Sequence, residues 1–143
     1  MLEKINIHSS ISVYEQIENQ VKFAIASGLL KDGEQLPSIK ELGDRLGINF
    51  NTVAKAYRDL EVMGLIYTRR GTGCFVQKGV RDKCREDCHA RIIRRVHEVV
   101  QEAKAAALPR KFLNDIISKS FASDSELYGE VPKEVMALAK QKY

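Results

Sequence analysis

The stretch GINFNTVAKAY, residues 47–57, decides the fold of the N-terminal half of this chain. A helix turns by about 100° per residue, so its residues separate into two faces. The apolar face, which we predict to enter the core, consists of Val53, Ala56, Tyr57, Leu60 and Met63. The opposite face consists of Asn51, Ala54, Lys55 and Arg58. That face is either an ordinary solvated surface or a DNA-reading surface, because asparagine pairs with adenine and lysine reaches guanine or phosphate.

The start of this helix leaves two residues with open roles. Asn49 is a favourable N-cap, which predicts a helix over residues 49–63 that ends at Gly64. Asn49 either caps this helix or contacts a base. Phe50 stands between two asparagines, and it either covers the helix start or contacts a thymine methyl group.

Upstream residues predict two further helices. Ser12 and Glu15 have the spacing of a capping box, and the apolar pattern then predicts a helix over 12–27 that ends at Gly28. Ser38 and Glu41 repeat the box before a helix over 38–46. A short turn with a glycine between the second and third helices is typical of a helix-turn-helix. The helix starts at Ser38 and Asn49 also suit phosphate groups.

Downstream, LIYTRRGTGCFVQ, residues 65–77, predicts a β-hairpin with strands at 65–69 and 74–77. Three helices followed by a hairpin form a winged helix. Arg69, Arg70 and Gly71 then lie at the hairpin tip, where they are either a solubilising turn or a contact to the minor groove or phosphates.

Residues 79–143 predict a separate helical part. A long helix over 82–107 carries an apolar stripe made of Cys88, Ile92, Val96, Val99, Ala103 and Ala106, widened by Ile93 and Val100. A second amphipathic helix over 110–121 carries Phe112, Leu113, Ile116, Ile117 and Phe121. A loop and a short last helix at 132–141, with Pro132 at its first position, complete the chain. Two helices cannot bury this stripe alone, so it predicts pairing with a second chain.

Composition bounds the function. The 143 residues carry a net charge of +4, and residues 1–78 contribute only +1, from ten Lys/Arg and nine Asp/Glu. DNA binding must therefore depend on local placement. No apolar run reaches the roughly 20 residues of a membrane span, and no signal peptide is recognisable, so we expect a cytoplasmic protein without a membrane partner. No catalytic or cofactor-binding motif is recognisable, which predicts no enzyme activity and no cofactor.

Three cysteines in such a chain predict no disulfide framework. Cys84, Cys88 and His89 leave open a metal- or thiol-responsive sensor. Because a tetrahedral zinc site uses four ligands, the favoured prediction is no metal site.

VYEQI and GLLKDGEQLPSIKELGDRLGINFNTVAKAYRDLEVMGLIYTRRGTGCFV resemble, over residues 10–77 and without a gap, the DNA-binding domain of GntR-family bacterial transcription regulators. The NFNTV stretch and the short remainder resemble the YtrA-like subfamily. The resemblance implies a mainly α fold with a small β-hairpin: a winged helix-turn-helix domain at 1–78, then a helical dimerisation region at 79–143. It also implies a homodimeric repressor that binds a palindromic double-stranded DNA operator, with no effector identified.

The residues that we expect at DNA, by pattern or by resemblance, are Ser38, Lys40, Asn49, Phe50, Asn51, Thr52, Lys55, Arg58, Arg69, Arg70 and Gly71. Those that we expect at the dimer interface are Cys88, Ile92, Val96, Val99, Val100, Ala103, Phe112, Leu113, Ile116 and Ile117. The alternatives are the thiol or metal sensor and a winged helix used for protein–protein contact.

Overall fold

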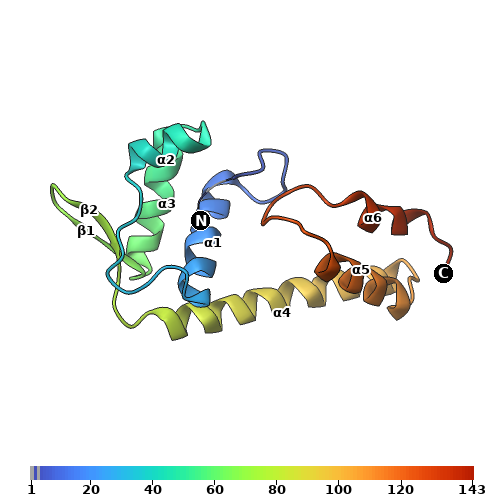
Figure 1. The fold of residues 1–143 in the computed structure, drawn as a ribbon. Coiled ribbons are helices and arrows are strands. Elements are labelled where there is room, and N and C mark those ends of the chain that lie inside the picture. Colours follow the sequence, from blue (N-terminus) through green and yellow to red (C-terminus); the bar gives the residue numbers. More distant parts are fainter. Residues whose placement is uncertain (1, 3) are drawn as a thin grey trace. The chain divides into compact units, whose positions relative to one another are not determined.

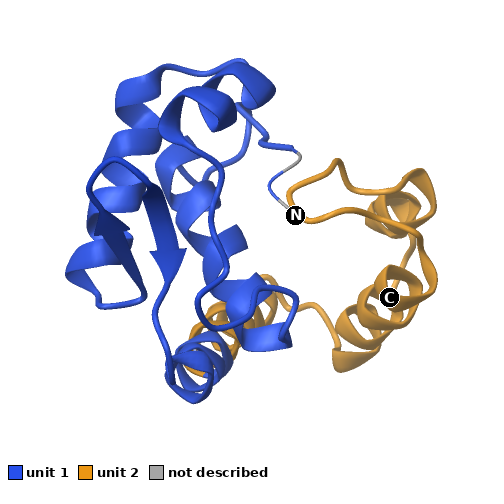
Figure 2. Ribbon diagram, turned by 60° about the vertical axis from the view of Figure 1, so that its left-hand side comes forward, with its two compact units in different colours: residues 1–89 blue, residues 90–143 orange. Residues whose placement is uncertain are grey.

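The computed structural model describes residues 2 and 4–143. The chain forms two compact units, residues 1–89 and 90–143 (Figure 2). The boundary between these units lies inside helix α4, Arg81–Ala105. The first turn of α4 packs with the first unit, because Cys84 is buried in its core and Lys83 Nζ donates to the Met63 carbonyl over 3.1 Å.

The first unit contains the three predicted helices, each within a residue of its expected bounds. They are α1 Val13–Ser27, α2 Ile39–Leu46 and α3 Phe50–Val62 (Figure 1). Gly28 and Gly47 end α1 and α2 in the left-handed conformation, with φ of 82° and 66°, which glycine adopts without a steric penalty. The predicted capping box at Ser12 is wrong, because within the described residues the Ser12 side chain makes no cap hydrogen bond.

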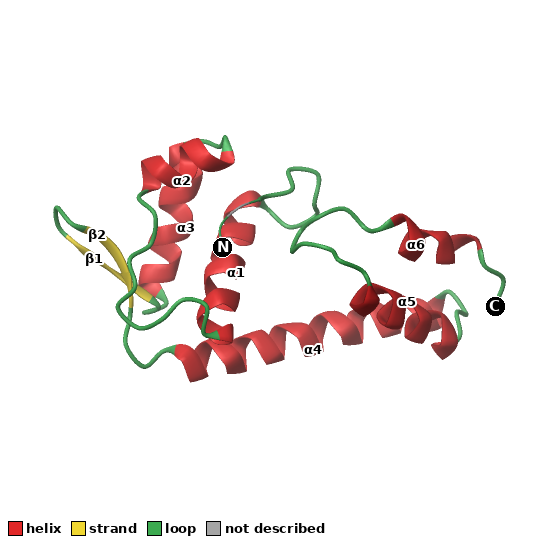
Figure 3. Cartoon of the chain, in the orientation of Figure 1, coloured by secondary structure: helices red, strands yellow, loops and turns green. Residues whose placement is uncertain are grey.

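The predicted hairpin is present as antiparallel strands β1 Ile66–Arg69 and β2 Gly73–Val76 (Figure 3). Ile66 pairs with Val76, and Arg69 pairs with Gly73. Gly71 lies in the turn with φ of 77°. The segment before α2 supports the hairpin, since Leu36 N donates to Cys74 O over 2.9 Å. Three helices and this wing confirm the winged helix-turn-helix fold.

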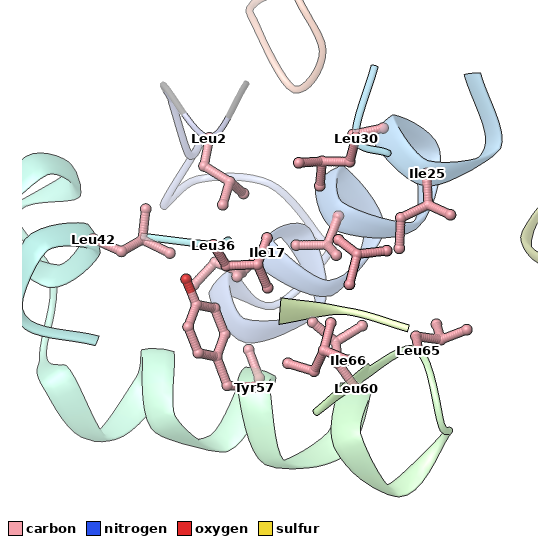
Figure 4. Close-up of a cluster of buried hydrophobic side chains, with 14 of the residues drawn as sticks. Leu2, Ile17, Ile25, Leu30, Leu36, Leu42, Tyr57, Leu60, Leu65 and Ile66 are labelled. Atoms are coloured by element: carbon pink, nitrogen blue, oxygen red, sulfur yellow. The ribbon is translucent and has the colours of Figure 1, made fainter. Parts of the chain in front are cut away.

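The core of the first unit is built from all of these elements. Ile17 of α1, Leu42 of α2, Leu60 of α3 and Ile66 of β1 meet there (Figure 4). The Tyr57 hydroxyl donates to the Pro37 carbonyl over 2.6 Å, which ties α3 to the turn before α2. The predicted core face of α3 is confirmed, with Met63 at its half-buried edge.

Polar side chains of α1 also hold the N-terminal segment. Gln16 accepts from Asn6 N over 2.7 Å and donates to the carbonyls of Asn6 and Ile11. Gln20 donates to the Lys4 carbonyl over 2.8 Å. Leu2 is buried in the same core. The segment before α1 is therefore part of the folded unit.

The second unit contains the rest of α4, then α5 Arg110–Ala122 and α6 Lys133–Met136. The expected last helix divides, because a 3-10 turn at Ala137–Lys140 follows α6 directly. Pro132 is the N-cap and not the first helical residue. Both short elements pack on α5, and Tyr143 contacts it through an edge-to-face pair with Phe112 (ring centroids 5.2 Å apart). Among the described residues, no helix is long and apolar enough to cross a membrane.

Candidate nucleic-acid interface

The outer face of α3 is available to a ligand. Asn51, Lys55 and Arg58 are exposed along it, while Val53 and Leu60 on the opposite face are fully buried. The division that periodicity predicts therefore holds in the fold. A helix of this kind presents amide and cationic groups that suit the edges of bases and the phosphates.

Both helix starts of the helix-turn-helix are capped by side chains. Ser38 Oγ accepts from Glu41 N over 3.0 Å, and Asn49 Oδ1 accepts from Asn51 N over 2.8 Å. The capping role of Asn49 is confirmed. Thr52 is half-buried one turn into α3, and its N–H donates to the Asn49 carbonyl over 3.1 Å. Capping does not exclude a phosphate, because the positive end of the helix dipole attracts anions to the same place.

Phe50, the first residue of α3, has one covered side and one open side. Its ring lies against Gly43 of α2, where a Cβ added to the glycine would come within 2.7 Å of Phe50 Cε1 and closer still to Cδ1. The side chain nevertheless remains 44% exposed. Phe50 therefore covers α2 only in part.

Two lysines of this surface already have intramolecular partners. Lys55 Nζ lies 3.8 Å from the centroid of the Tyr14 ring in α1, within the range of a cation–π contact. Lys40 Nζ lies 3.4 Å from Asp44 Oδ2, one turn along α2. Sequence reasoning missed Tyr14, because its spacing within α1 carries no information about α3.

The wing presents two exposed arginines, as predicted. Arg69 lies 5.5 Å from the centroid of the Phe75 ring, and that ring stacks on Tyr67 at 5.5 Å. Arg70 and Gly71 form the exposed tip. Tyr67 and Phe75 therefore pack on each other across the two strands, beside Arg69.

A pair of carboxyl groups lies between α1 and α3, on the side of α3 away from its exposed polar face. Glu18 is only 6% exposed, and among the described residues its Oε1 has no hydrogen-bond partner. Burial, together with a side-chain hydrogen bond to Asp59 and repulsion from it, raises the pKa of Glu18 to about 7. The charge of the nearby Lys22 lowers this pKa, but by less than burial and Asp59 raise it. Sequence patterns do not mark this pair.

The cysteines are not arranged as an evident metal site. Cys84 is buried, and burial raises the pKa of its thiol to about 11. A protonated thiol is a poor metal ligand and a poor nucleophile. In the described part of the chain, no group of three or more His, Cys, Asp and Glu side chains is placed to hold a metal ion.

The residues expected at a dimer interface divide by exposure. Ile92, Val96 and Val99 of α4 and Ile117 of α5 are exposed. Cys88, Val100, Phe112, Leu113 and Ile116 are half-buried, and Ala103 is buried. Four of these ten residues are thus open to solvent within their own chain, and three of the four lie on α4.

Comparison with known proteins agrees with this geometry. Residues 13–76 match the family described as bacterial regulatory proteins, gntR family. The chain is 33% identical over 116 residues to the HTH-type transcriptional repressor YtrA of Bacillus subtilis, which covers 81% of this chain and 89% of that protein. It is 32% identical over 75 residues to the HTH-type transcriptional regulator Rv1152 of Mycobacterium tuberculosis, covering 52% and 62% of the two chains.

Solved structures agree as well. A GntR family transcriptional regulator from Listeria monocytogenes superposes with a TM-score of 0.60 at 27% identity, covering 78% of this chain and 96% of that one. YtrA from Sulfolobus acidocaldarius, a GntR-family transcription factor, superposes with a TM-score of 0.51 at 35% identity, covering 65% and 99%. These relatives are regulators and not enzymes. The chain is a DNA-binding transcription regulator, and it belongs to the GntR family.

Proposed function

We propose that this regulator represses transcription in the bacterial cytoplasm by binding a palindromic operator as a homodimer. The observation that carries the proposal is the exposed polar face of α3, opposite a fully buried apolar face. Helix α3 is the second helix of the helix-turn-helix pair formed by α2 and α3, and in proteins of this kind that helix enters the major groove. Repression is supported by the similarity to YtrA of Bacillus subtilis, which is named a repressor.

The exposed residues divide into readers and anchors. Asn51 reads a base edge in this proposal, because a side-chain amide can pair with adenine through two hydrogen bonds. Lys55 and Arg58 reach guanine or phosphates from the same face. Ser38, Lys40, Asn49 and Thr52 hold phosphates near the two helix starts, where free amides and the helix dipole favour anions. Arg69, Arg70 and Gly71 carry the wing contact to phosphates or the minor groove.

The stripe on α4 supports a second chain as partner. Ile92, Ile93, Val96 and Val99 are between 48% and 67% exposed. Contact between water and this apolar surface is unfavourable. Burial against a partner would stabilise the complex by roughly 25 cal/mol for each Å² of apolar surface removed from water. A twofold dimer through α4 and α5 would carry two reading helices, which implies two inverted half-sites.

Selection of bound DNA from a random pool by the full chain tests this proposal. We expect enrichment of an inverted repeat whose half-sites are about one helical turn apart, or a multiple of that distance. Enrichment of no sequence would contradict a sequence-specific regulator.

A salt titration separates DNA binding from use of the winged helix as a protein-interaction module. Phosphate contacts release counterions, so affinity should fall steeply with salt. Arg70→Ala should weaken binding to all sequences and reduce the slope of log affinity against log salt by about 1. Leu29→Ala, which removes an exposed, uncharged side chain outside the wing, is the control that should leave this slope unchanged. An unchanged slope in Arg70→Ala would contradict the wing contact.

A further inference from the structure

The ring of Phe50 is fixed on one side by a glycine. Gly43 lies inside α2 and is buried, although glycine is a poor helix former compared with alanine. Its φ is not in the left-handed region, so its backbone does not require glycine there. A Cβ at this position would instead collide with Phe50, coming within 2.7 Å of Cε1. The absence of a side chain at Gly43 is what lets the ring lie against α2.

The same residue is also partly exposed. Phe50 is the first residue of α3, directly after the capping Asn49 and before the exposed Asn51. It is 44% exposed, so a large part of it remains in contact with water. It therefore offers apolar surface at the helix end where helix-turn-helix proteins contact base edges.

Only one base presents an apolar group in the major groove, the C5-methyl group of thymine. Contact between an exposed aromatic ring and this methyl group makes binding more favourable, because it removes the apolar surface of both from water. A ring held against α2 loses little rotational freedom on binding, which favours the contact further.

We infer that Phe50 reads a thymine 5-methyl group in each half-site, and that Gly43 is the positioning residue that holds the ring toward it. This inference rests on the proposed function, because it requires α3 to lie in the major groove. Phe50 supplies an apolar specificity contact beside the hydrogen-bonding Asn51. Gly43 acts only through Phe50.

Replacement of thymine by uracil in the selected operator tests the methyl contact directly, because it removes the methyl group and leaves base pairing unchanged. Each thymine of one half-site is replaced in turn, and affinity is measured by fluorescence anisotropy. We expect one position, or two adjacent ones, to lose about fourfold in affinity per half-site, equivalent to roughly 0.8 kcal/mol for one buried methyl group. Phe50→Ala should bind thymine and uracil operators equally at that position.

Gly43→Ala tests the positioning role. The added methyl group should displace the ring, so that the thymine preference at the sensitive position falls below twofold. Affinity for random DNA and its salt dependence should stay as in the native chain, which a general loss of structure would not allow. Leu29→Ala is the matched control: Leu29 is exposed and apolar but lies after α1, and its loss should leave the thymine preference intact. Thermal melting checks that each variant folds.

The outcomes separate this inference from the proposed function. Specific operator binding without a loss at any uracil would contradict the methyl contact and leave the DNA-binding function standing. Retention of the thymine preference in Phe50→Ala would also overturn it. Full preference in Gly43→Ala would overturn the role of Gly43 alone. Failure to select any operator would contradict the proposed function itself.

Discussion

Helices α3 and α4 both carry an apolar stripe, but the stripe of α3 is buried and the stripe of α4 is exposed. On α3, Val53, Ala56 and Leu60 have no exposed surface, because α1, α2 and the hairpin cover them. On α4, Ile92, Val96 and Val99 remain about half exposed. Periodicity thus identifies the residues that share a face, but it does not tell whether the same chain or another covers that face. The difference separates the folding core from the proposed interface.

Leu60→Ala should have the largest effect on the stability of the single chain. Removal of a fully buried leucine side chain leaves a cavity and should lower the free energy of unfolding by about 2–5 kcal/mol. Urea denaturation at low protein concentration measures this. Val96→Ala, at an exposed apolar position, should change the same quantity by less than about 0.5 kcal/mol. Equal losses in the two variants would remove the distinction between the two stripes.

Val96→Glu should act on assembly and leave the fold intact. A charge within the stripe opposes burial against a second chain, so the dimer should dissociate. A single chain binds one half-site without the help of a joined second chain, so affinity for the operator should fall by about 100-fold or more. Light scattering and anisotropy measure the two effects. Leu29→Glu introduces the same charge at an exposed leucine outside α4 and should stay dimeric. If Val96→Glu remained dimeric, the interface would have to lie elsewhere.

Glu18→Gln tests the buried side of the comparison, because Glu18 is buried and, among the described residues, its Oε1 has no hydrogen-bond partner. The pKa of Glu18 is raised from 4.5 to about 7. Its contribution to stability is therefore complete below pH 4.5 and is lost as pH rises through 7. Above pH 7 the variant should be more stable than the native chain by on the order of 2 kcal/mol, and this gain should vanish near pH 4.5.

Urea denaturation at pH 4.5 and pH 8 checks this dependence. Glu34→Gln, at an exposed loop position, is the control and should show no such difference. A gain in Glu18→Gln that is the same at both pH values would argue against titration of Glu18.

Asn51→Ala should have the most local effect. Asn51 is exposed and takes no part in the core, so the stability of the fold should not change. Preference at one or two operator positions should relax by about 1–3 kcal/mol. Competition assays with single-base operator variants measure this. Equal losses on operator and random DNA would show that Asn51 does not read a base.

Local patterns were enough to predict much of this molecule. The face of α3, the glycine stops at Gly28 and Gly47, and the wing all depend on residues close together in the chain. Contacts between distant residues were not predictable in this way. Gln16 binds the N-terminal backbone, Lys55 lies over Tyr14, and Phe50 lies on Gly43. Each depends on how two elements pack, which no single periodicity contains.

Two local predictions failed. Ser12 has the right spacing for a capping box, but its side chain makes no cap hydrogen bond at the start of α1. The last helix divides because Val135 and Leu138 both turn onto α5, where they are buried. The division of the last helix therefore follows from packing between elements, which a local pattern does not contain.

Sedimentation of the full chain with its selected operator tests the central claim most directly. The claim is that α3 contacts DNA while the exposed stripe of α4 joins two copies. We predict two chains on each duplex that carries the inverted repeat, and a single chain per duplex for Val96→Glu on one half-site. One native chain on the full operator, or no complex at all, would contradict the account.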